Sequence, residues 1–302
     1  KSLYENESSG LLKSWELPSS QIIQELVKEA HKEDMQVLLH APSYEGQKFG
    51  IKTNVDIMAH SMWNWFKDPT KYLDTIFPKS HQDVLLKIIS KRVGYQLTFR
   101  TIYGEIDLLK NQFMNDSELK NVFSESYLKW LKTEEAQWGK RKIEHRGEFL
   151  KVANPDFYNT IRSKFKSNKD MFDSVYTILK RRMNIVAKFL SDKNANLLFA
   201  TDGVAMNMNT NPPGYNGYLE MNHWLNAGVS LENIFKAATL NNAKAFHIDD
   251  QYGTLEKGKV ANILILDKNP LLKISAYNAI NSVILRGKKH NRDKLSAVSD
   301  NK

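Results

Sequence analysis

The chain has 302 residues, 41% of them hydrophobic, and a formal net charge of +9 at pH 7. This length and composition allow a sizeable buried core and exclude an intrinsically disordered protein. Basic residues are spread along the whole chain and alternate with acidic ones, so we expect a solvated basic surface and no nucleic-acid site.

The sequence contains no cysteine, which excludes disulfides and thiolate zinc sites and leaves histidine and carboxylate side chains as metal ligands. No apolar run approaches the roughly 20 residues that a membrane-spanning helix needs, and no signal peptide is visible. Because the chain begins with Lys1 rather than methionine, the sequence is compatible with an upstream segment and leaves the cellular location open.

Two predicted strands near the start of the chain each end in a histidine. Residues 18–34 have the apolar spacing of a helix, and residues 35–39 and 55–59 are short apolar runs followed by His40 and His60. Strands that repeat in this way are typical of β-α-β units in a parallel sheet or barrel. The carboxyl ends of such strands share one face, so we expect both imidazoles there. Spacing alone leaves open whether they form a metal site or are packed or capping histidines.

The middle of the chain has a different composition. A further strand is predicted over residues 95–101, and residues 105–192 are rich in Lys, Glu, Asn and aromatic side chains with helical spacing. This stretch predicts a helical insertion. Trp130 and Trp138 are candidates for a lid over a substrate, although an amphipathic helix that packs its apolar face is the commoner explanation.

A carboxylate follows the next predicted strand. Residues 196–200 form an apolar run that ends at Thr-Asp-Gly, which delivers Asp202 to the edge where α/β proteins keep their chemistry. A loop rich in Pro, Gly and Asn comes next, and we expect Tyr215, Asn216 and Glu220 to contact substrate from it. The alternative is that its Pro and Gly residues only turn the chain.

The C-terminal third carries several short motifs. They are Thr-Asp-Gly at 201–203, Asn-Pro-Pro-Gly-Tyr-Asn-Gly-Tyr-Leu-Glu-Met at 211–221, Asn-Ala-Gly-Val-Ser at 226–230, Ala-Ala-Thr-Leu-Asn-Asn-Ala at 237–243 and Gly-Thr-Leu-Glu-Lys-Gly-Lys-Val-Ala-Asn at 253–262. This series resembles the metal-dependent amidohydrolase superfamily, in its imidazolonepropionase-like and prolidase-like branch. The resemblance is continuous from 197 to about 286, thinner over 1–60, and absent from roughly 105 to 192.

The resemblance implies a metal site. In this superfamily the fifth, sixth and eighth barrel strands end in His, His and Asp, which implies His40, His60 and Asp202 as ligands of one or two divalent ions, with zinc favoured. The family's fourth-strand lysine, which can be carboxylated to bridge two metal ions, falls at Lys1, where an ordinary lysine is the alternative. The family's first-strand His-x-His pair is missing, because none of the eight histidines are two residues apart.

The implied fold is α/β: the C-terminal part, about strands 4–8, of a TIM-like (β/α)8 metallo-hydrolase barrel with a helical insertion, followed by C-terminal strands of a small β-sandwich. The partial barrel would occupy residues 1–260, beginning with a strand near 2–4. The sandwich strands, near 262–266 and 282–286, would occupy residues 261–302. Missing barrel strands would leave open sheet edges. We therefore expect a C-terminal portion that needs the N-terminal barrel strands of its own polypeptide and aggregates alone, and a homo-oligomer is left open.

The implied function is hydrolysis of a C–N bond in an amide, cyclic amide or dipeptide-like small molecule. Metal-activated water would attack the carbonyl carbon, and Asp202 would take a proton and return it to the leaving nitrogen. His60 would act as a ligand or as a hydrogen-bond donor to the substrate carbonyl. A catalytically inactive structural homologue is the alternative, because the first-strand ligands are missing from this chain.

Overall fold

The computed structural model describes residues 2–4, 19–110, 112–203 and 209–297. Five short strands form one parallel sheet whose spatial order equals the chain order: β1 (Ser2–Tyr4), β2 (Leu38–His40), β3 (Ile57–Ala59), β4 (Gly94–Gln96) and β5 (Leu197–Leu198). Each lies where the sequence predicts a strand. Adding parallel strands one after another in the same direction is the pattern of a (β/α) barrel, whereas a doubly wound sheet reverses its order.

Three helices connect the first four strands: α1 (Ser20–Lys32), α2 (Tyr44–Thr53) and α3 (Lys79–Ser90). The sequence patterns did not reveal α2. Ser43 caps this helix by accepting the Gly46 N–H at 2.9 Å. Gly50 lets α2 approach the sheet closely, because a Cβ at this position would lie 2.4 Å from the Met58 Cε. Two glycines within ten residues lower the helix propensity of this segment, which is why the sequence pattern does not indicate a helix. Packing on the sheet stabilises the helix nevertheless.

The strand predicted over residues 95–101 is shorter than expected. β4 ends before Leu97, and the chain turns through Thr98 into α4 (Arg100–Lys110). Leu97 and Phe99 are fully buried, as strand residues would be, but they lie in the turn. The apolar alternation therefore indicates burial here without extended backbone.

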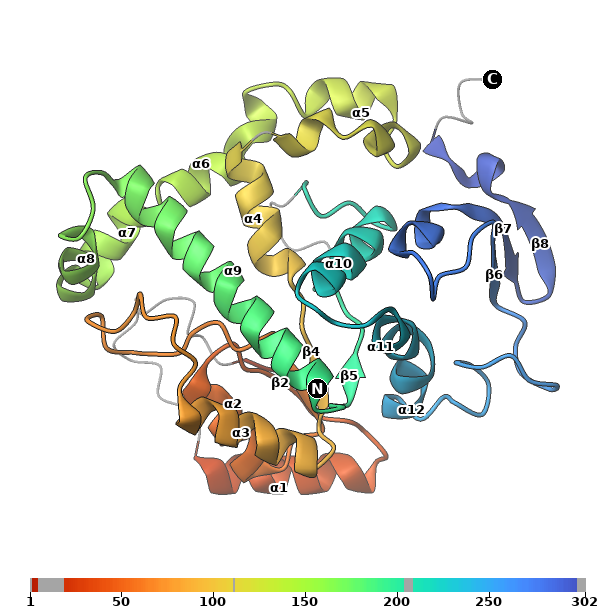
Figure 1. Cartoon of the computed structure of the whole chain (residues 1–302), viewed down its shortest axis with the longest axis horizontal. Coiled ribbons are helices and arrows are strands. Elements are labelled where there is room, and N and C mark those ends of the chain that lie inside the picture. Colours follow the sequence, from red (N-terminus) through yellow and green to blue (C-terminus); the bar gives the residue numbers. More distant parts are fainter. Residues whose placement is uncertain (1, 5–18, 111, 204–208, 298–302) are drawn as a thin grey trace.

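The stretch between β4 and β5 is a series of helices, as its spacing predicts (Figure 1). After α4 come α5 (Glu125–Trp130), α6 (Trp138–Glu144), α7 (Arg146–Ala153), α8 (Pro155–Arg162) and α9 (Asn168–Asp192). The long helix α9 packs Met183, Val186 and Leu190, all fully buried, into the main core. Trp130 and Trp138 are 38% and 47% exposed, so a lid role for them stays a prediction.

The C-terminal part begins with three helices, α10 (Tyr215–Asn226), α11 (Leu231–Lys236) and α12 (Asn242–Ala245). An antiparallel sheet follows, made of β6 (Ile263–Leu266), β7 (Ile280–Leu285) and β8 (Lys288–Asn291). Strand β8 was not predicted, because its sequence Lys-Lys-His-Asn is polar and lacks the apolar pattern of a strand.

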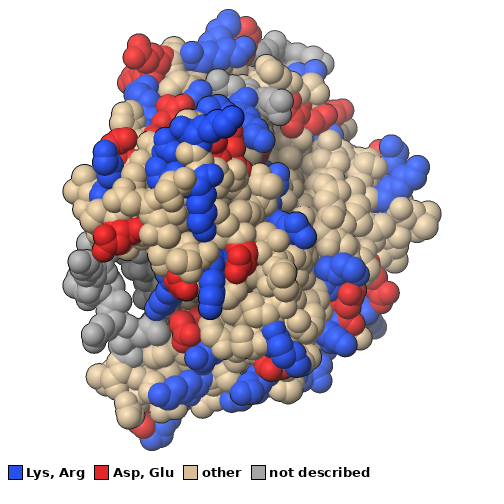
Figure 2. Space-filling view, turned by 60° about the vertical axis from the view of Figure 1, so that its left-hand side comes forward, with Lys and Arg blue, Asp and Glu red and all other residues tan. Residues whose placement is uncertain are grey.

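The surface carries both signs of charge. On the face shown in Figure 2, Lys and Arg side chains are interspersed with Asp and Glu. This mixture fits the expectation of a solvated basic surface. Within the described ranges, no helix has the length and apolar character needed to cross a membrane.

Candidate functional site

Three residues at the carboxyl ends of adjacent strands have left-handed backbone conformations. They are His60 after β3, Thr98 after β4 and Asp202 after β5, with φ values of 75°, 47° and 56°. Histidine and aspartate tolerate such values better than a β-branched threonine does. Each costs about 1–3 kcal/mol and persists only where surrounding contacts enforce it. These three strained residues lie at the sheet edge where barrel enzymes keep their active sites, and other described residues with positive φ, among them Asn54 and Arg92, precede the strands at the opposite end.

The structure brings the two predicted histidines together. His40 pairs with Ala59 across β2 and β3, so His60, the next residue, lies beside it at the strand ends. Their ring centroids are 4.4 Å apart in an edge-to-face arrangement. Burial, together with the neighbouring His40, lowers the pKa of His60 to about 3. Neutral imidazole is the form that binds a divalent metal ion, so the His60 ring offers a nitrogen ligand of the right kind, with a second imidazole beside it.

Thr98 is a neighbour of His60 that sequence reasoning missed. The Thr98 Oγ lies 2.7 Å from the His60 Nδ1, and both residues are buried. The Trp63 ring packs near His60, with 5.6 Å between their centroids. A signal for Thr98 existed, because it follows an apolar strand just as His40 and His60 do. Predicting that strand through residue 101 placed Thr98 inside it and hid the signal.

Asp202 follows β5 at the same edge of the sheet. Two amide side chains bind the edge of β5 that faces away from β4. Asn241 donates to the Leu197 carbonyl at 3.0 Å, and Asn242 accepts the Phe199 N–H at 3.0 Å and donates to its carbonyl at 2.8 Å. Asp202 is solvent-exposed, yet partial desolvation of its carboxyl raises its pKa. A raised pKa suits a group that takes up a proton near neutral pH.

The predicted ligand set is only partly assembled. Among the residues that the structure describes, no three His, Asp or Glu side chains lie close enough together to hold a metal ion. His40 and His60 form a pair, and Asp202 does not complete a group of three with them. Lys1 lies outside the described residues. Two imidazoles fit the donor chemistry of zinc and supply half of a tetrahedral ligand set.

The predicted substrate contacts lie on a helix. Tyr215, Asn216 and Glu220 all belong to α10, so their placement in a loop is wrong. The helix begins directly after Gly214, whose φ of 77° allows the turn that precedes it. Asn216 is buried, and the Tyr215 hydroxyl donates to an Asp116 carboxylate oxygen at 2.8 Å.

The Glu220 carboxylate is fully buried and binds the turn that follows β4. It accepts the backbone N–H groups of Phe99 and Arg100, both at 2.8 Å, and the Trp224 Nε1–H at 2.6 Å. Burial raises the pKa of Glu220 to about 7, and the three donors oppose this shift. In this structure Glu220 therefore fastens α10 to the start of α4.

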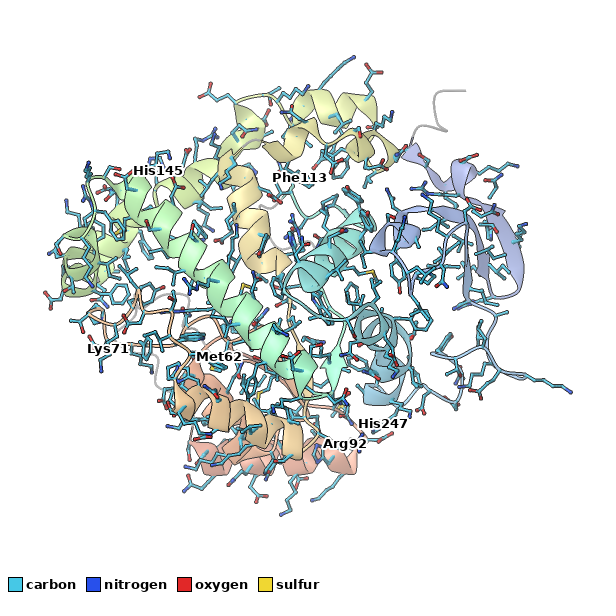
Figure 3. The ribbon with its side chains drawn as sticks, in the orientation of Figure 1. Met62, Lys71, Arg92, Phe113, His145 and His247 are labelled. Carbon is cyan, nitrogen blue, oxygen red and sulfur yellow. The ribbon has the colours of Figure 1, made fainter. Side chains whose placement is uncertain are left out.

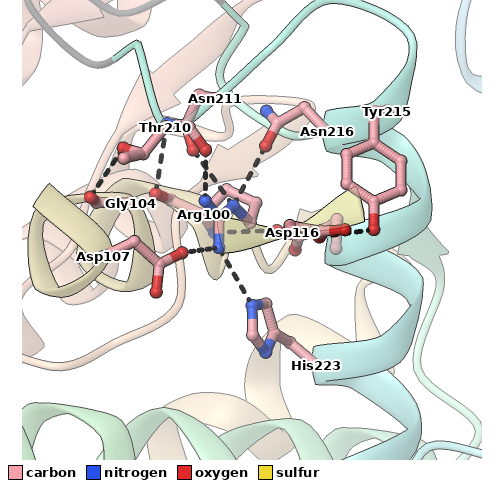
Figure 4. A network of polar contacts seen from close by, with 10 residues as sticks. Arg100, Gly104, Asp107, Asp116, Thr210, Asn211, Tyr215, Asn216 and His223 are labelled. Carbon is pink, nitrogen blue, oxygen red and sulfur yellow. Dashed lines mark hydrogen bonds and ion pairs between the residues drawn. The ribbon is translucent and has the colours of Figure 1, made fainter. Parts of the chain in front are cut away.

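Arg100 forms a polar network that joins α4 to residues 210–211 and to α10 (Figure 4). Its guanidinium is buried and donates to Asp107 at 2.7 Å, to Asn211 and Asn216 at 3.0 Å, to the Thr210 carbonyl and to the His223 Nε2 at 3.2 Å. Burial, and next the charge of Arg100, lower the pKa of His223 to about 3, so its neutral ring accepts this hydrogen bond. The network holds residues 210–216 against α4.

A second buried arginine binds the segment that follows His60. Arg182 on α9 donates to the backbone carbonyls of Trp63 at 3.1 Å, of Tyr72 at 2.7 Å and of Asp74 at 2.7 Å. Its guanidinium also lies over the Trp65 ring, 5.0 Å from the centroid. Burial lowers the pKa of Arg182 to about 10. Arg182 of the helical insertion therefore binds the backbone of Trp63, the residue whose ring packs near His60.

A cavity of about 440 Å³ opens at the opposite end of the sheet, where β3, β4 and β5 begin. Its lining includes Asp56, Arg92, Asn196 and His247, and Figure 3 shows Arg92 and His247 near one another at that end. Barrel enzymes keep their active sites at the carboxyl ends of the strands. This cavity is therefore separate from the candidate site.

Comparison with known proteins gives concordant results. The sequence profile of the Amidohydrolase family matches residues 13–289. The imidazolonepropionase of Picrophilus torridus is 36% identical over 77 residues, which is 24% of this chain and 19% of that protein. Among solved structures, phenylurea hydrolase B matches with a TM-score of 0.56 and 18% identity, covering 96% of this chain and 50% of that one.

A Xaa-Pro dipeptidase with methionine bound in its active site also matches, with a TM-score of 0.55 and 18% identity, covering 93% of this chain and 51% of that one. The chain thus spans about half the length of these solved structures. Similarity at this level of identity shows a shared fold, the TIM-like α/β fold.

Proposed function

The chain belongs to the amidohydrolase family, and from this premise we propose that it hydrolyses a C–N bond in an amide, cyclic amide or dipeptide-like small molecule with the help of a divalent metal ion. The observation that carries the proposal is the pair of rings at adjacent strand ends, His40 and His60, with centroids 4.4 Å apart. The structural likeness to a dipeptidase and to a phenylurea hydrolase is consistent with this substrate class.

The proposed fold assignment is that β1 to β5 correspond to about strands 4–8 of a (β/α)8 barrel within residues 1–260. The antiparallel strands β6 to β8, within residues 261–302, correspond to the C-terminal strands of a small β-sandwich. The sequential order of the parallel strands supports this assignment. Closing the barrel takes three further strands, which we propose come from other parts of the same polypeptide.

His40 and His60 would hold the metal ion, with Asp202 as the adjacent carboxylate and a carboxylated Lys1 as a further candidate ligand. Zinc fits these donors best. When bound, such an ion supplies Lewis acidity, which lowers the pKa of water from about 15.7 toward 7 and polarises a carbonyl. Burial keeps the His60 ring neutral and ready to bind, and the Trp63 ring beside it limits access of water from that side.

Asp202 moves the proton in this proposal. A carboxylate oxygen of Asp202 takes a proton from water while the water oxygen bonds to the carbonyl carbon of the substrate. The C–N bond then breaks, and Asp202 returns the proton to the leaving nitrogen. The raised pKa of Asp202 supports this role, because a more basic carboxylate accepts the proton more readily. The alternative for a site with only one metal ion is that His60 is not a ligand and instead donates a hydrogen bond to the substrate carbonyl.

Two observations favour a second candidate function, a catalytically inactive structural homologue. The described residues contain no group of three potential ligands, and the sequence contains no His-x-His pair. Such a homologue would keep the fold and would lack stoichiometric metal and turnover.

An assay of the complete polypeptide, which includes the three further barrel strands, in the presence of zinc or manganese separates the two functions. We would measure hydrolysis of N-acyl amino acids, cyclic amides and Xaa-Pro dipeptides. The hydrolase proposal expects turnover of at least one class, abolished in His40→Ala/His60→Ala and retained in His145→Ala, whose histidine is exposed at the end of α6. Absence of turnover and of bound metal would support the inactive homologue.

A further inference from the structure

The geometry points to Thr98 as a positioning residue that holds the His60 ring, and to Glu220 as the group that holds Thr98. This inference rests on the proposed metal site, because it concerns the residue that presents one of its ligands. Thr98 joins the ring of His60 through a single short contact, with 2.7 Å between its Oγ and the His60 Nδ1.

The backbone at Thr98 shows that the contact is enforced. A threonine with a φ of 47° is strained, and glycine or asparagine would adopt this conformation more readily. However, neither glycine nor asparagine has the Cβ hydroxyl that threonine places here. Strain of this kind persists only where neighbouring contacts fix the conformation, and it gathers at functional sites.

Contacts on the C-terminal side of Thr98 fix its conformation. Its carbonyl accepts the Thr101 backbone N–H at 3.2 Å and the Thr101 hydroxyl at 2.8 Å. The next two backbone N–H groups, those of Phe99 and Arg100, are both bound by the Glu220 carboxylate at 2.8 Å. The chain of contacts therefore runs from α10 through the turn after β4 to the imidazole.

The consequence for His60 is a defined ring orientation. The ring turns its Nδ1 toward the Thr98 hydroxyl, so Nε2 is the nitrogen left for a ligand. A metal-binding imidazole whose second nitrogen is hydrogen-bonded in this way has its orientation and tautomer set by that partner. Loss of such a partner lowers metal affinity by about 10–100-fold.

The test compares Thr98→Val, which keeps the shape and removes the hydroxyl, with Thr98→Ser, which keeps the hydroxyl. We would record the ring ¹⁵N resonances of His60 in the metal-free complete polypeptide and measure its zinc affinity. We expect shifted or broadened His60 resonances and a 10–100-fold loss of zinc affinity in Thr98→Val, and values near wild type in Thr98→Ser. His60 resonances that are unchanged in Thr98→Val would overturn the inference, whatever the protein does with zinc.

The Glu220 step has its own matched pair of variants. Glu220→Gln keeps the volume but has one acceptor oxygen for the two turn N–H groups, so the His60 resonances should shift although residue 220 does not touch His60. Trp224→Phe removes the third donor to Glu220 and leaves the turn contacts in place. We expect Trp224→Phe to leave the His60 resonances as in wild type. Equal shifts in both variants would contradict the proposed chain of contacts from Glu220 through Thr98 to His60.

Absence of zinc binding by the wild-type chain would instead count against the proposed function. The resonance comparison on the metal-free chain keeps the two failures apart.

Discussion

The imidazole rings of His40 and His60 lie edge to face at the ends of two neighbouring parallel strands, with 4.4 Å between their centroids. The register of β2 and β3, in which His40 pairs with Ala59, produces this approach. Burial disfavours a positive charge on the His60 ring, so this ring is neutral. Two imidazoles held in this way are suited to bind one cation, and the functional proposal starts from that arrangement.

Asp202 should be essential for turnover. Asp202→Asn keeps the shape of the side chain but cannot accept a proton, so the rate should fall by a factor on the order of 10² or more. Steady-state kinetics on any verified amide substrate would measure the change, with Asp83→Asn on the exposed side of α3 as the control. Undiminished turnover in Asp202→Asn would remove Asp202 from the role of base.

His223 should contribute to the loss of stability in acid. Its pKa is about 6.5 in an unfolded chain and about 3 in the folded protein. The unfolded state therefore binds more protons between these values, and the stabilisation from neutral His223 is present above pH 6.5 and is lost as the pH falls toward 3.

His223→Gln replaces this ring with a group that does not titrate. Between pH 7 and pH 4, the unfolding free energy of wild type should fall by an amount on the order of 1–3 kcal/mol more than that of His223→Gln. Urea unfolding at a series of pH values checks it. Parallel stability curves for the two proteins would show that His223 is not the titrating group.

Arg182 should be important for stability, because it donates to three backbone carbonyls, one in a buried contact and two in partly buried contacts. Arg182→Met removes the donors and leaves the carbonyls of Trp63, Tyr72 and Asp74 without them, which should cost about 2–4 kcal/mol. The neighbouring Arg181 is exposed, so Arg181→Met should change stability by less than about 0.5 kcal/mol. Equal unfolding midpoints for both variants in urea would contradict this role.

Much of the sheet was predictable from the sequence, because β2, β3 and β5 lie in apolar runs that lead to a polar residue. His40 and His60 follow such runs, and the structure places their rings together. Asp202 follows another apolar run, and its place at the sheet edge agrees with the strand that this run predicts. The family resemblance supplied the expected chemistry of these positions, which spacing alone left open.

The contacts around these residues were not predictable in the same way. Glu220 binds backbone groups more than a hundred residues away in the chain, at Phe99 and Arg100, and no local pattern encodes that pairing. The turn at Thr98 was hidden because Leu97 and Phe99 are buried in it and mimic strand alternation. Arg182 lies on a long amphipathic helix, where a single arginine on the buried face looks like a surface residue until the fold is known.

The metal content of the complete polypeptide, with the three further barrel strands included, tests the central claim most directly. Elemental analysis of purified protein should find a stoichiometric divalent ion, zinc or a similar metal, in wild type and in the surface variant His145→Ala. The His40→Ala/His60→Ala double variant should lose it, because both imidazole ligands are gone. A stoichiometric metal content undiminished in the double variant would contradict the assignment of these two histidines and the proposed function built on them.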